Sequence, residues 1–463
     1  MGDQAYPADV LGMSGAEMRR LGHKVVDRIV DRLENRNAEA AIKTGCPDAL
    51  RETLGGPLPE NPTDADTSID LLADIALNHQ QHGDHPRYFA RIPGPASFAG
   101  MLADWLGTGF NTIAASWAGG SGPATVEVIA VEWLAELIGM PKHTEGVFMS
   151  GGSLANLTAL ATARHEVGRG VVYVTSQTHS SLIRDLRVLG WEDESIRWVQ
   201  TDDRWRMCVR NLKETLERDA EAGQKPAIVI ASAGTTNTGA IDPLKEIAAV
   251  CQENGIWFHI DGSYGAPAAM AERARSEFEG MDLADSLALD PHKWLFQPYD
   301  IGACLVTRPG ALERRHAVTP EYLKDAHLGQ KGKGAVNFGN RSLELSRRSR
   351  ALKVWLSLRT YGAGAFRAAV NRGIELAEFA EEELRRHPNQ WEVVTPAQIG
   401  IVCFALKDGR PNLHSDRAQA LADSGFACVT STKLGGRSVL RLCCINPLTT
   451  ENDIRETLCR LLP

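Results

Sequence analysis

IWFHID at residues 256–261 and ADSLALDPHKW at residues 284–294 decide the fold of this chain. Each contains an apolar run, typical of a buried strand, that ends in polar residues. Further β-branched runs are VVYVT (171–175), AIVIAS (227–232) and GACLV (302–306), and helix-like stretches such as 153–167 and 243–254 lie between the runs. This alternation predicts a mostly parallel sheet that is covered on both faces. Ligands of such sheets bind beyond the carboxyl ends of the strands.

The regions outside this sheet are less regular. Ser14-Gly15-Ala16-Glu17 is a capping box that predicts the start of an N-terminal helix. HPRYFARIPGPAS (85–97) and SWAGGSGPAT (116–125) contain so much glycine and proline that we expect loops there, and we expect a long helix over 341–360. The chain is therefore expected to have three parts, which are a helical, dimer-forming segment at 1–84, a large α/β domain at 85–360 and a small α+β domain at 361–463.

Composition narrows the possible functions. The chain has 463 residues and a formal net charge of -8, which argues against a polyanion such as DNA as its partner. It has no run of about 18 apolar residues that could span a membrane, and its first residues lack the features of a secretory signal. The nine cysteines show no CxxC spacing, which favours reduced thiols over a disulfide scaffold or a zinc site. We therefore expect a cytoplasmic protein that binds neither nucleic acid, membrane nor metal.

Two residues near the ends of predicted strands are candidates for chemistry. Lys293 is flanked by His, Trp, Leu and Phe, which indicates a lysine shielded from water. Such shielding lowers the pKa of an amine and makes it nucleophilic. Asp261 ends the run IWFHID, where a carboxylate can keep a nearby ring nitrogen protonated. A simple turn residue at the end of a strand would look the same.

Three further segments are expected at the same edge of the sheet. MSGGSLANL (149–157) places two glycines and a serine before a helix, which suits a phosphate, although such turns are common. His179 follows VVYVT and either stacks on a ring or caps the next helix, and GTTNTGAIDP (234–243) adds hydroxyl groups. A reactive lysine, an acid for a pyridine nitrogen, a phosphate cradle and a flat side chain are together what pyridoxal 5′-phosphate (PLP) requires of a protein.

These motifs together resemble the group II PLP-dependent amino-acid decarboxylases, and among them most of all the aromatic L-amino-acid decarboxylases. The resemblance runs from about residue 14 to the end and is most specific in the HKW box together with Asp261, 32 residues before Lys293. It includes HPRYFARIP, SWAGGSGPATVEV, HIDGSYG, DPHKWL, TPEYL, RRSRALKVW and RLCCINPLTTENDI, although HIDGSYG stands where the family usually has His-Val-Asp-Ala-Ala-Tyr. It implies an α/β fold of the aspartate-aminotransferase type (fold type I), with a mostly parallel seven-stranded sheet, an N-terminal helical segment and a small C-terminal α+β domain. It also implies an obligate homodimer in which loops of both subunits form each active site.

The resemblance assigns a role to each candidate residue. It implies that Lys293 holds PLP as a Schiff base, that Asp261 pairs with the pyridine nitrogen and that His179 stacks on the ring. Tyr322, in TPEYL, matches the tyrosine that protonates the substrate carbon after CO2 leaves. These four are the predicted catalytic residues. The residues expected to hold the phosphate or lie close to the cofactor are Gly152, Ser153, Thr236, Ser286 and His292.

The departures from the family pattern fall in the substrate pocket. Arg91-Ile92-Pro93-Gly94 stands where the aromatic enzymes have Tyr-Phe-Pro-Thr, and Ala115, two residues before Trp117, replaces a phenylalanine. The predicted substrate contacts are Ile92, Pro93, Ala115, Trp117 and His179. Arg91 is either a surface residue or a contact for a polar substrate tail. The expected substrate is an aromatic L-amino acid (Trp, Tyr, Phe, DOPA or 5-hydroxy-Trp), and a bulky aliphatic amino acid is the alternative.

Two other functions stay open. An aldehyde synthase performs oxidative decarboxylation and deamination on the same fold, but relatives that do so often carry phenylalanine where this chain keeps Tyr322. A non-catalytic scaffold on a decayed enzyme frame would not need the four predicted catalytic residues together. An NAD-binding protein is excluded because no GxGxxG follows the first predicted strand. The sequence therefore predicts a carboxy-lyase of amino-acid metabolism.

Overall fold

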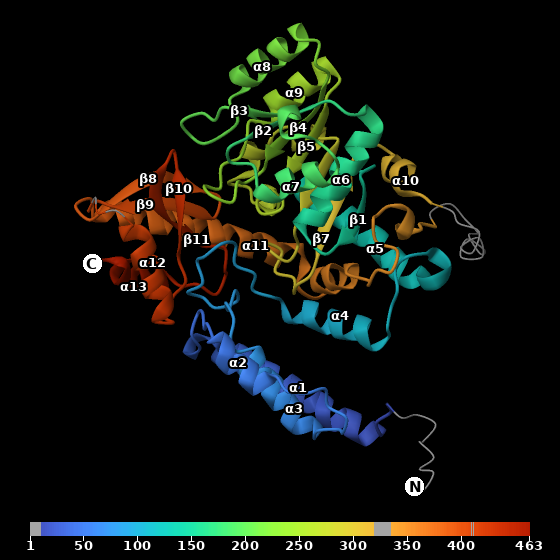
Figure 1. Cartoon of the computed structure of the whole chain (residues 1–463), viewed down its shortest axis with the longest axis vertical. Coiled ribbons are helices and arrows are strands. Elements are labelled where there is room, and N and C mark those ends of the chain that lie inside the picture. The colour runs from blue at the N-terminus through green and yellow to red at the C-terminus, as the bar shows by residue number, and fades with distance from the viewer. Residues whose placement is uncertain (1–10, 319–334, 409, 411) are drawn as a thin grey trace.

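The structure is a computed structural model that describes residues 11–318, 335–408, 410 and 412–463. Figure 1 shows a large sheet between helices, a smaller sheet with its own helices, and N-terminal helices that project from the body. The large sheet has seven strands and the smaller sheet has four. The N-terminal helices are α1 (Gly15–Asn35), α2 (Pro47–Leu54) and α3 (Ala65–Leu71). Among the described residues, no helix is both long enough and apolar enough to cross a membrane.

The large sheet has the strand order β1-β7-β6-β5-β4-β2-β3. Its strands are β1 (Glu145–Met149), β2 (Val171–Thr175), β3 (Ile196–Val199), β4 (Pro226–Ser232), β5 (Trp257–Asp261), β6 (Ser286–Leu289) and β7 (Gly302–Val306). Strands β2 to β6 run parallel, whereas β7 is antiparallel to both β6 and β1. The predicted mostly parallel seven-stranded sheet is confirmed, and β5, which ends in Asp261, is its central strand.

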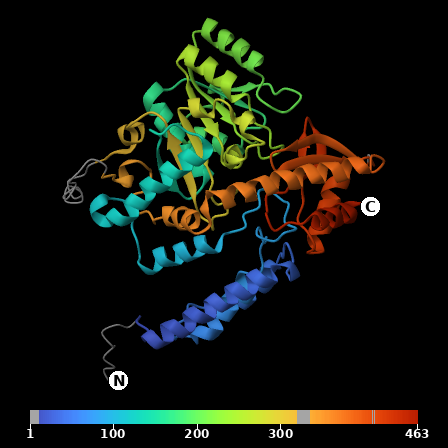
Figure 2. The same ribbon diagram turned by 180° about the vertical axis from the view of Figure 1, so that it is seen from behind.

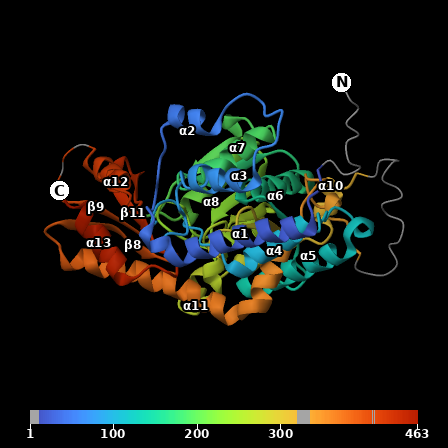
Figure 3. The same ribbon diagram turned by 90° about the horizontal axis from the view of Figure 1, so that it is seen from below.

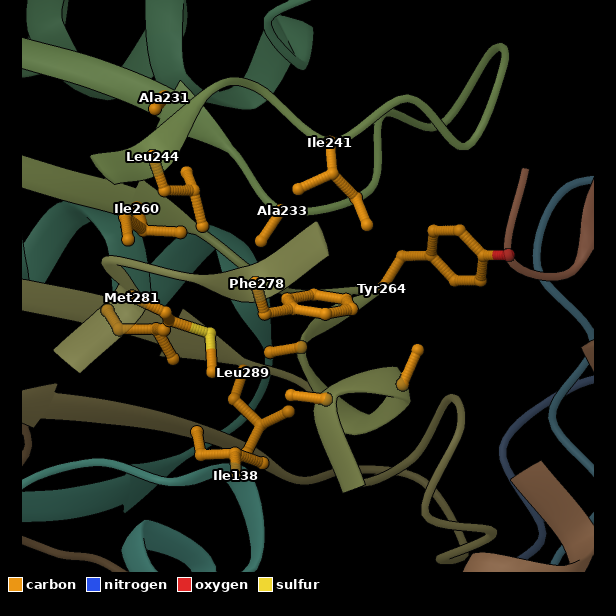
Figure 4. Packing of buried hydrophobic residues seen from close by; sticks show 14 of the residues in the cluster. Ile138, Ala231, Ala233, Ile241, Leu244, Ile260, Tyr264, Phe278, Met281 and Leu289 are labelled. Carbon is orange, nitrogen blue, oxygen red and sulfur yellow. The ribbon is translucent and has the colours of Figure 1, made fainter. Parts of the chain in front are cut away.

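Helices cover both faces of this sheet because alternate side chains of each strand point to opposite layers. On one face, α6 (Gly152–Val167), α7 (Ser180–Val188) and α10 (Ala311–His316) pack their apolar side chains on the strands, as Leu160 and Val147 illustrate. On the other face lie α5 (Trp117–Ile138), α8 (Val209–Glu221) and α9 (Leu244–Asn254), where Ile138 and Leu244 belong to one core with Ile260 (Figure 4). Each fully buried side chain of this kind contributes roughly 1.5–3 kcal/mol.

The segment SWAGGSGPAT was expected to be a loop, and this prediction is wrong because the segment begins α5. Ser116 caps the helix, since its Oγ accepts a hydrogen bond from the N–H of Gly119 at 3.1 Å. The helix breaks at Gly120, which has φ -166° and ψ 65°, and Pro123 follows within the restarted turn. Proline is tolerated in a first turn because its missing N–H has no partner to lose there.

One long helix, α11 (Ala351–Arg386), joins the two sheets, as the view from behind shows (Figure 2). Its contacts are with α4 (Phe98–Gly109) and α5 on one side of the molecule and with the second sheet on the other. The expected helix at 341–360 was placed wrongly, since α11 begins at Ala351. Gly362, with φ 75°, kinks the helix. The predicted domain boundary between 360 and 361 lies beside this kink and stays a prediction.

The second sheet forms the small C-terminal α+β part. It has the order β10-β11-β9-β8 and is antiparallel throughout. Its strands are β8 (Trp391–Gln398), β9 (Ile401–Leu406), β10 (Thr430–Leu434) and β11 (Arg437–Cys443), and its helices are α12 (Leu413–Asp423) and α13 (Glu451–Leu461). Strands β8, β9 and β11, both helices and the second half of α11 contribute to a second core, whereas Leu434 of β10 belongs to the core of the large sheet. The expected C-terminal α+β part is thus confirmed.

Candidate active site

A cavity of about 440 Å³ lies at the carboxyl ends of β4 and β5, beside the start of α6. The structure brings seven predicted residues into its lining, namely Gly152, Ser153, His179, Thr236, Asp261, His292 and Lys293. They come from segments far apart in the sequence, and each follows or ends an element of the large sheet. This is the edge at which parallel α/β sheets bind ligands.

Asp261 is held at the floor of the cavity by the strands on both sides of β5. It pairs with Ser232 of β4 and with Ala288 of β6 in the sheet register. Its Oδ1 accepts a hydrogen bond from the N–H of Ser263 at 3.1 Å, and only 8% of the residue is exposed. A buried carboxylate at this place can pair with a protonated ring nitrogen, because an opposite charge stabilises the charged form.

Lys293 follows β6 in a tight turn, in which its N–H donates to the carbonyl of Asp290 at 3.0 Å. Its Nζ lies 2.9 Å from Asp290 Oδ2, and its side chain keeps 24% of its surface exposed. Burial alone would lower the pKa of Lys293, but the carboxylate of Asp290, with a contribution from Asp261, outweighs burial and raises that pKa. The expectation of a lowered lysine pKa is therefore wrong for this structure, because the sequence pattern did not reveal the ion pair.

The start of α6 forms a narrow cradle that excludes larger residues. A Cβ on Gly152 would come within 2.6 Å of Ser263 Oγ and 2.7 Å of Asp290 Oδ2. On the neighbouring strand β7, a Cβ on Gly302 would lie 2.5 Å from the carbonyl carbon of Gly151. The first N–H groups of a helix have no partner within it and attract anions. Ser263 Oγ is buried and has no hydrogen-bond partner among the described residues, so it is free to donate to a ligand.

His292 is a neutral donor beside this cradle. The N–H of Ile301 donates to His292 Nδ1 at 3.2 Å, which leaves the proton on Nε2. Burial lowers the pKa of His292, which keeps its ring uncharged near neutral pH. Its Nε2–H can therefore donate to an anion without adding a charge.

His179 combines both roles that the sequence left open. It caps α7, because its Nδ1 accepts from the N–H of Ser181 at 3.3 Å, and it also lines the cavity. Thr236 is placed by the second sheet, since Arg441 Nε donates to the carbonyl of Thr236 at 2.8 Å. The next residue is held in the same way, as Thr432 Oγ1 donates to Asn237 Oδ1 at 3.0 Å. No local sequence pattern indicated these contacts.

Ser286 does not line the cavity. Its hydroxyl accepts from Trp257 Nε1 at 2.8 Å and lies 2.8 Å from His259 Nδ1, while His259 Nε2 lies 2.9 Å from Asn156 Oδ1. Burial lowers the pKa of His259 to about 4, so this buried chain of hydrogen bonds is neutral. Ser286 therefore has no support in this geometry as a phosphate ligand; it links the central strands to α6 instead.

The predicted substrate contacts other than His179 do not line the cavity within this chain. Ile92 packs against the core of the large sheet and Pro93 is buried beside it. The carbonyl of Ala115 accepts from the N–H of Gly339 at 2.8 Å, and the N–H of Trp117 donates to Asn337 Oδ1 at 2.8 Å. Tyr322 lies outside the described residues.

Asp290 and Ser263 are site residues that the sequence analysis missed. Asp290 stands within DPHKW itself, three residues before Lys293, and Ser263 stands within HIDGSYG, so both were visible in the decisive motifs. The residues present fit PLP, because the helix start and the unpartnered Ser263 hydroxyl suit its phosphate, Asp261 suits its ring nitrogen and Lys293 its aldehyde.

Comparisons with known proteins identify the family. Residues 47–407 match the family model described as the pyridoxal-dependent decarboxylase conserved domain. The chain is 41% identical to the aromatic-L-amino-acid decarboxylase of Bacillus atrophaeus, over 97% of this chain and 96% of that one. It is 30% identical to the phenylacetaldehyde synthase of Arabidopsis thaliana, over 96% of this chain and 95% of that one.

Among solved structures, Oryza sativa TDC with PLP and tryptamine superposes with a TM-score of 0.91 at 26% identity, covering 97% of each chain. This likeness extends over both sheets and the N-terminal helices, since nearly the whole chain is covered. With the family model, the long alignment and the lysine-bearing cavity in agreement, the chain belongs to the pyridoxal-dependent decarboxylases, and it is a PLP-dependent carboxy-lyase that acts on an amino acid.

Proposed function

We propose that this enzyme decarboxylates an aromatic L-amino acid to the corresponding amine and CO2. The observation that carries the proposal is the 41% identity to a protein named aromatic-L-amino-acid decarboxylase, over nearly the whole of both chains. A bulky aliphatic amino acid is the alternative substrate, because the residues at 91–94 and 115 depart from the aromatic pattern.

The proposed residue roles are those that the resemblance implies; the cavity supports all of them except that of Tyr322, which lies outside the described residues. PLP, when bound, supplies an electron sink for the bond that breaks at the substrate carbon. Asp261 would hold the proton on the ring nitrogen, and His179 would cover the ring face. The start of α6 and the Nε2–H of His292 would hold the phosphate. Lys293 would bind the cofactor covalently and yield it to the substrate amine, and Tyr322 would return a proton to the substrate carbon.

A panel of amino acids tests the substrate. CO2 and amine release are measured with Trp, Tyr, Phe, DOPA and 5-hydroxy-Trp, and with Leu and Val as aliphatic members. Lys293→Ala is the matched control, because no amine would then be placed to bind the cofactor. Release from an aromatic substrate by the wild type alone supports the proposal. A preference for Leu or Val would replace the aromatic assignment by the aliphatic one.

An aldehyde synthase is the second candidate, favoured by the similarity to phenylacetaldehyde synthase. Such an enzyme consumes oxygen and releases aldehyde, ammonia and peroxide instead of amine. Peroxide measured in the same panel separates the two activities. The presence of a tyrosine at position 322 supports the simple decarboxylase.

We also propose that the enzyme is a homodimer. The projecting N-terminal helices and α4 expose large apolar side chains, including Trp105 (54% exposed) and Leu106 (57%). In the view from below α1 and α4 overlap (Figure 3), and a Cβ on Gly22 of α1 would lie 3.8 Å from Trp105 Cζ2. Apolar surface gathered in this way is typical of an interface. A partner could also bring Ala115 and Trp117 to a cavity that they do not line within one chain. Light scattering of the wild type and of Trp105→Glu measures the mass, and a monomeric wild type would contradict the proposal.

We propose a cytoplasmic location because the cysteines form no disulfide bonds. All nine are unpaired, and six of them are buried as isolated thiols or as the adjacent pair Cys443 and Cys444. Unpaired thiols are typical of proteins in reducing compartments. Fractionation of cells that express the protein checks this assignment.

A further inference from the structure

The amine that the cofactor must reach is already paired within the cavity. Lys293 Nζ lies 2.9 Å from Asp290 Oδ2, and the side chain of Asp290 is only 3% exposed. The second oxygen, Oδ1, is buried and has no hydrogen-bond partner among the described residues. The backbone hydrogen bond between the same two residues fixes them in one turn. The proposed decarboxylation gives Asp290 no role.

Other charged and titratable groups face this pair from three sides. Asp261 of β5 adds to the attraction of the ammonium group, and Tyr299 lies within electrostatic reach. His292 Nε2 lies 3.6 Å from Asp290 Oδ2. Asp290 also faces the start of α6, since a Cβ on Gly152 would come within 2.7 Å of its Oδ2. The carboxylate of Asp290 therefore lies beside the cradle that attracts the anionic cofactor. It pairs with the ammonium group of Lys293, to which the cofactor must bind.

We propose that Asp290 is a positioning residue that holds the amine of Lys293 as an ion pair until the cofactor arrives. This inference rests on the proposed role of Lys293. An ammonium group has no electron pair for a carbonyl carbon, so the ion pair keeps the lysine unreactive towards stray aldehydes. It also keeps Nζ at the floor of the cavity, where the aldehyde of PLP would be presented.

The loading step balances without any further reactant. The ammonium group first releases one proton to water. The electron pair of the nitrogen then forms a bond to the aldehyde carbon of PLP. The two remaining hydrogens of the amine leave with the aldehyde oxygen as one water molecule, and a carbon–nitrogen double bond results. No group is oxidised or reduced. The proposal concerns the release of the first proton, which sets how much free amine is present.

The effect of Asp290 on that proton has a defined direction. Burial lowers the pKa of Lys293, and Asp290 raises it above its ordinary value. If the carboxylate of Asp290 is removed, less remains to offset the effect of burial, and the pKa of Lys293 falls. A larger fraction of the amine is then free at neutral pH, and each unit of downward shift gives about tenfold more free amine. Asp290→Asn should therefore load faster than the wild type, although it lacks a group that could accept a proton.

The test measures covalent attachment instead of turnover. Cofactor-free protein is mixed with PLP, the bond is trapped by borohydride, and the rate is followed by mass spectrometry across neutral to alkaline pH. We expect Asp290→Asn to react about tenfold faster at neutral pH, with its midpoint at lower pH. Asp290→Glu keeps the charge and should resemble the wild type. A slower Asp290→Asn would show that the carboxylate removes the proton, and an unchanged profile would show that it does not control the amine; either overturns the proposal.

A second measurement separates this proposal from the cofactor assignment. Reductive methylation with formaldehyde labels free amines and needs no PLP site, so it reports on Lys293 even if PLP is not its ligand. Faster methylation of Lys293 in Asp290→Asn supports the ion pair independently. Failure of PLP to attach to the wild type would contradict the proposed function alone. Circular dichroism checks folding, and Asp290→Ser replaces Asp290→Asn if the latter does not fold.

Discussion

Replacing Gly152 by alanine tests whether the start of α6 is the cofactor cradle. The new Cβ would lie 2.6 Å from Ser263 Oγ and 2.7 Å from Asp290 Oδ2, closer than real side chains approach. The Ser263 hydroxyl can rotate away at small cost, but Asp290 is held by Lys293 at 2.9 Å. Either the carboxylate turns into the cavity or α6 shifts. Overpacking of this kind costs about 1–3 kcal/mol. The variant relieves it by one of these shifts, and PLP must reverse the shift in order to bind, so up to the same free energy appears as an increase of about 5- to 150-fold in the dissociation constant of PLP.

Equilibrium dialysis of PLP against the purified variants measures this increase. Gly364→Ala in α11 is the matched control, because its added Cβ would have no atom within 4 Å and alanine favours a helix. Thermal melting without cofactor separates a folding defect from a binding defect. Wild-type affinity in Gly152→Ala would refute the assignment of the cradle.

Three further changes test two other residues of the site and one buried ion pair of the core. Asp261→Asn should retain bound PLP but lose about 100- to 1,000-fold in kcat, because an amide cannot hold the proton on the ring nitrogen; an unchanged kcat would remove that role. Tyr322→Phe should slow amine release and yield aldehyde and peroxide, whereas normal amine release without aldehyde would exclude Tyr322 as proton donor. Arg347→Ala leaves Glu127 buried without its partner at 2.6 Å, so chemical denaturation should show a loss of about 3–5 kcal/mol. The double change Glu127→Gln with Arg347→Met should recover most of that loss.

The sequence predicted the large sheet well because its signals are local. Apolar runs such as VVYVT and GACLV coincide with β2 and β7. Ser232 and Asp261, which end β4 and β5, lie at the predicted edge and line the cavity. Asp261 and Lys293 could therefore be assigned to one site from the sequence alone. The two residues meet because β5 and β6 are parallel and adjacent, so that their carboxyl ends lie at the same edge.

The failures depend on side-chain directions and partners that a sequence motif does not specify. Glycine and proline in SWAGGSGPAT indicated a loop, but the cap at Ser116 and the break at Gly120 allow a helix there. Ser286 lies on β6 with its hydroxyl turned to Trp257 and His259, a direction that a motif does not specify. The pKa of Lys293 moves in the opposite sense to the one expected, because it depends on the placement of one carboxylate.

Arg441 has a consequence for any attempt to divide the chain. A fragment that stopped at residue 360 would keep every strand of the large sheet and every described residue that lines the cavity. It would lose the guanidinium of Arg441, which donates to the carbonyl of Thr236, and the hydroxyl of Thr432, which donates to Asn237. The loop at 234–243 would then lack its outer support, and its hydroxyl groups would no longer be held at the cavity. Such a truncated protein cannot serve as an independent cofactor-binding module, and exchanging C-terminal parts between relatives would alter cofactor affinity without touching a lining residue.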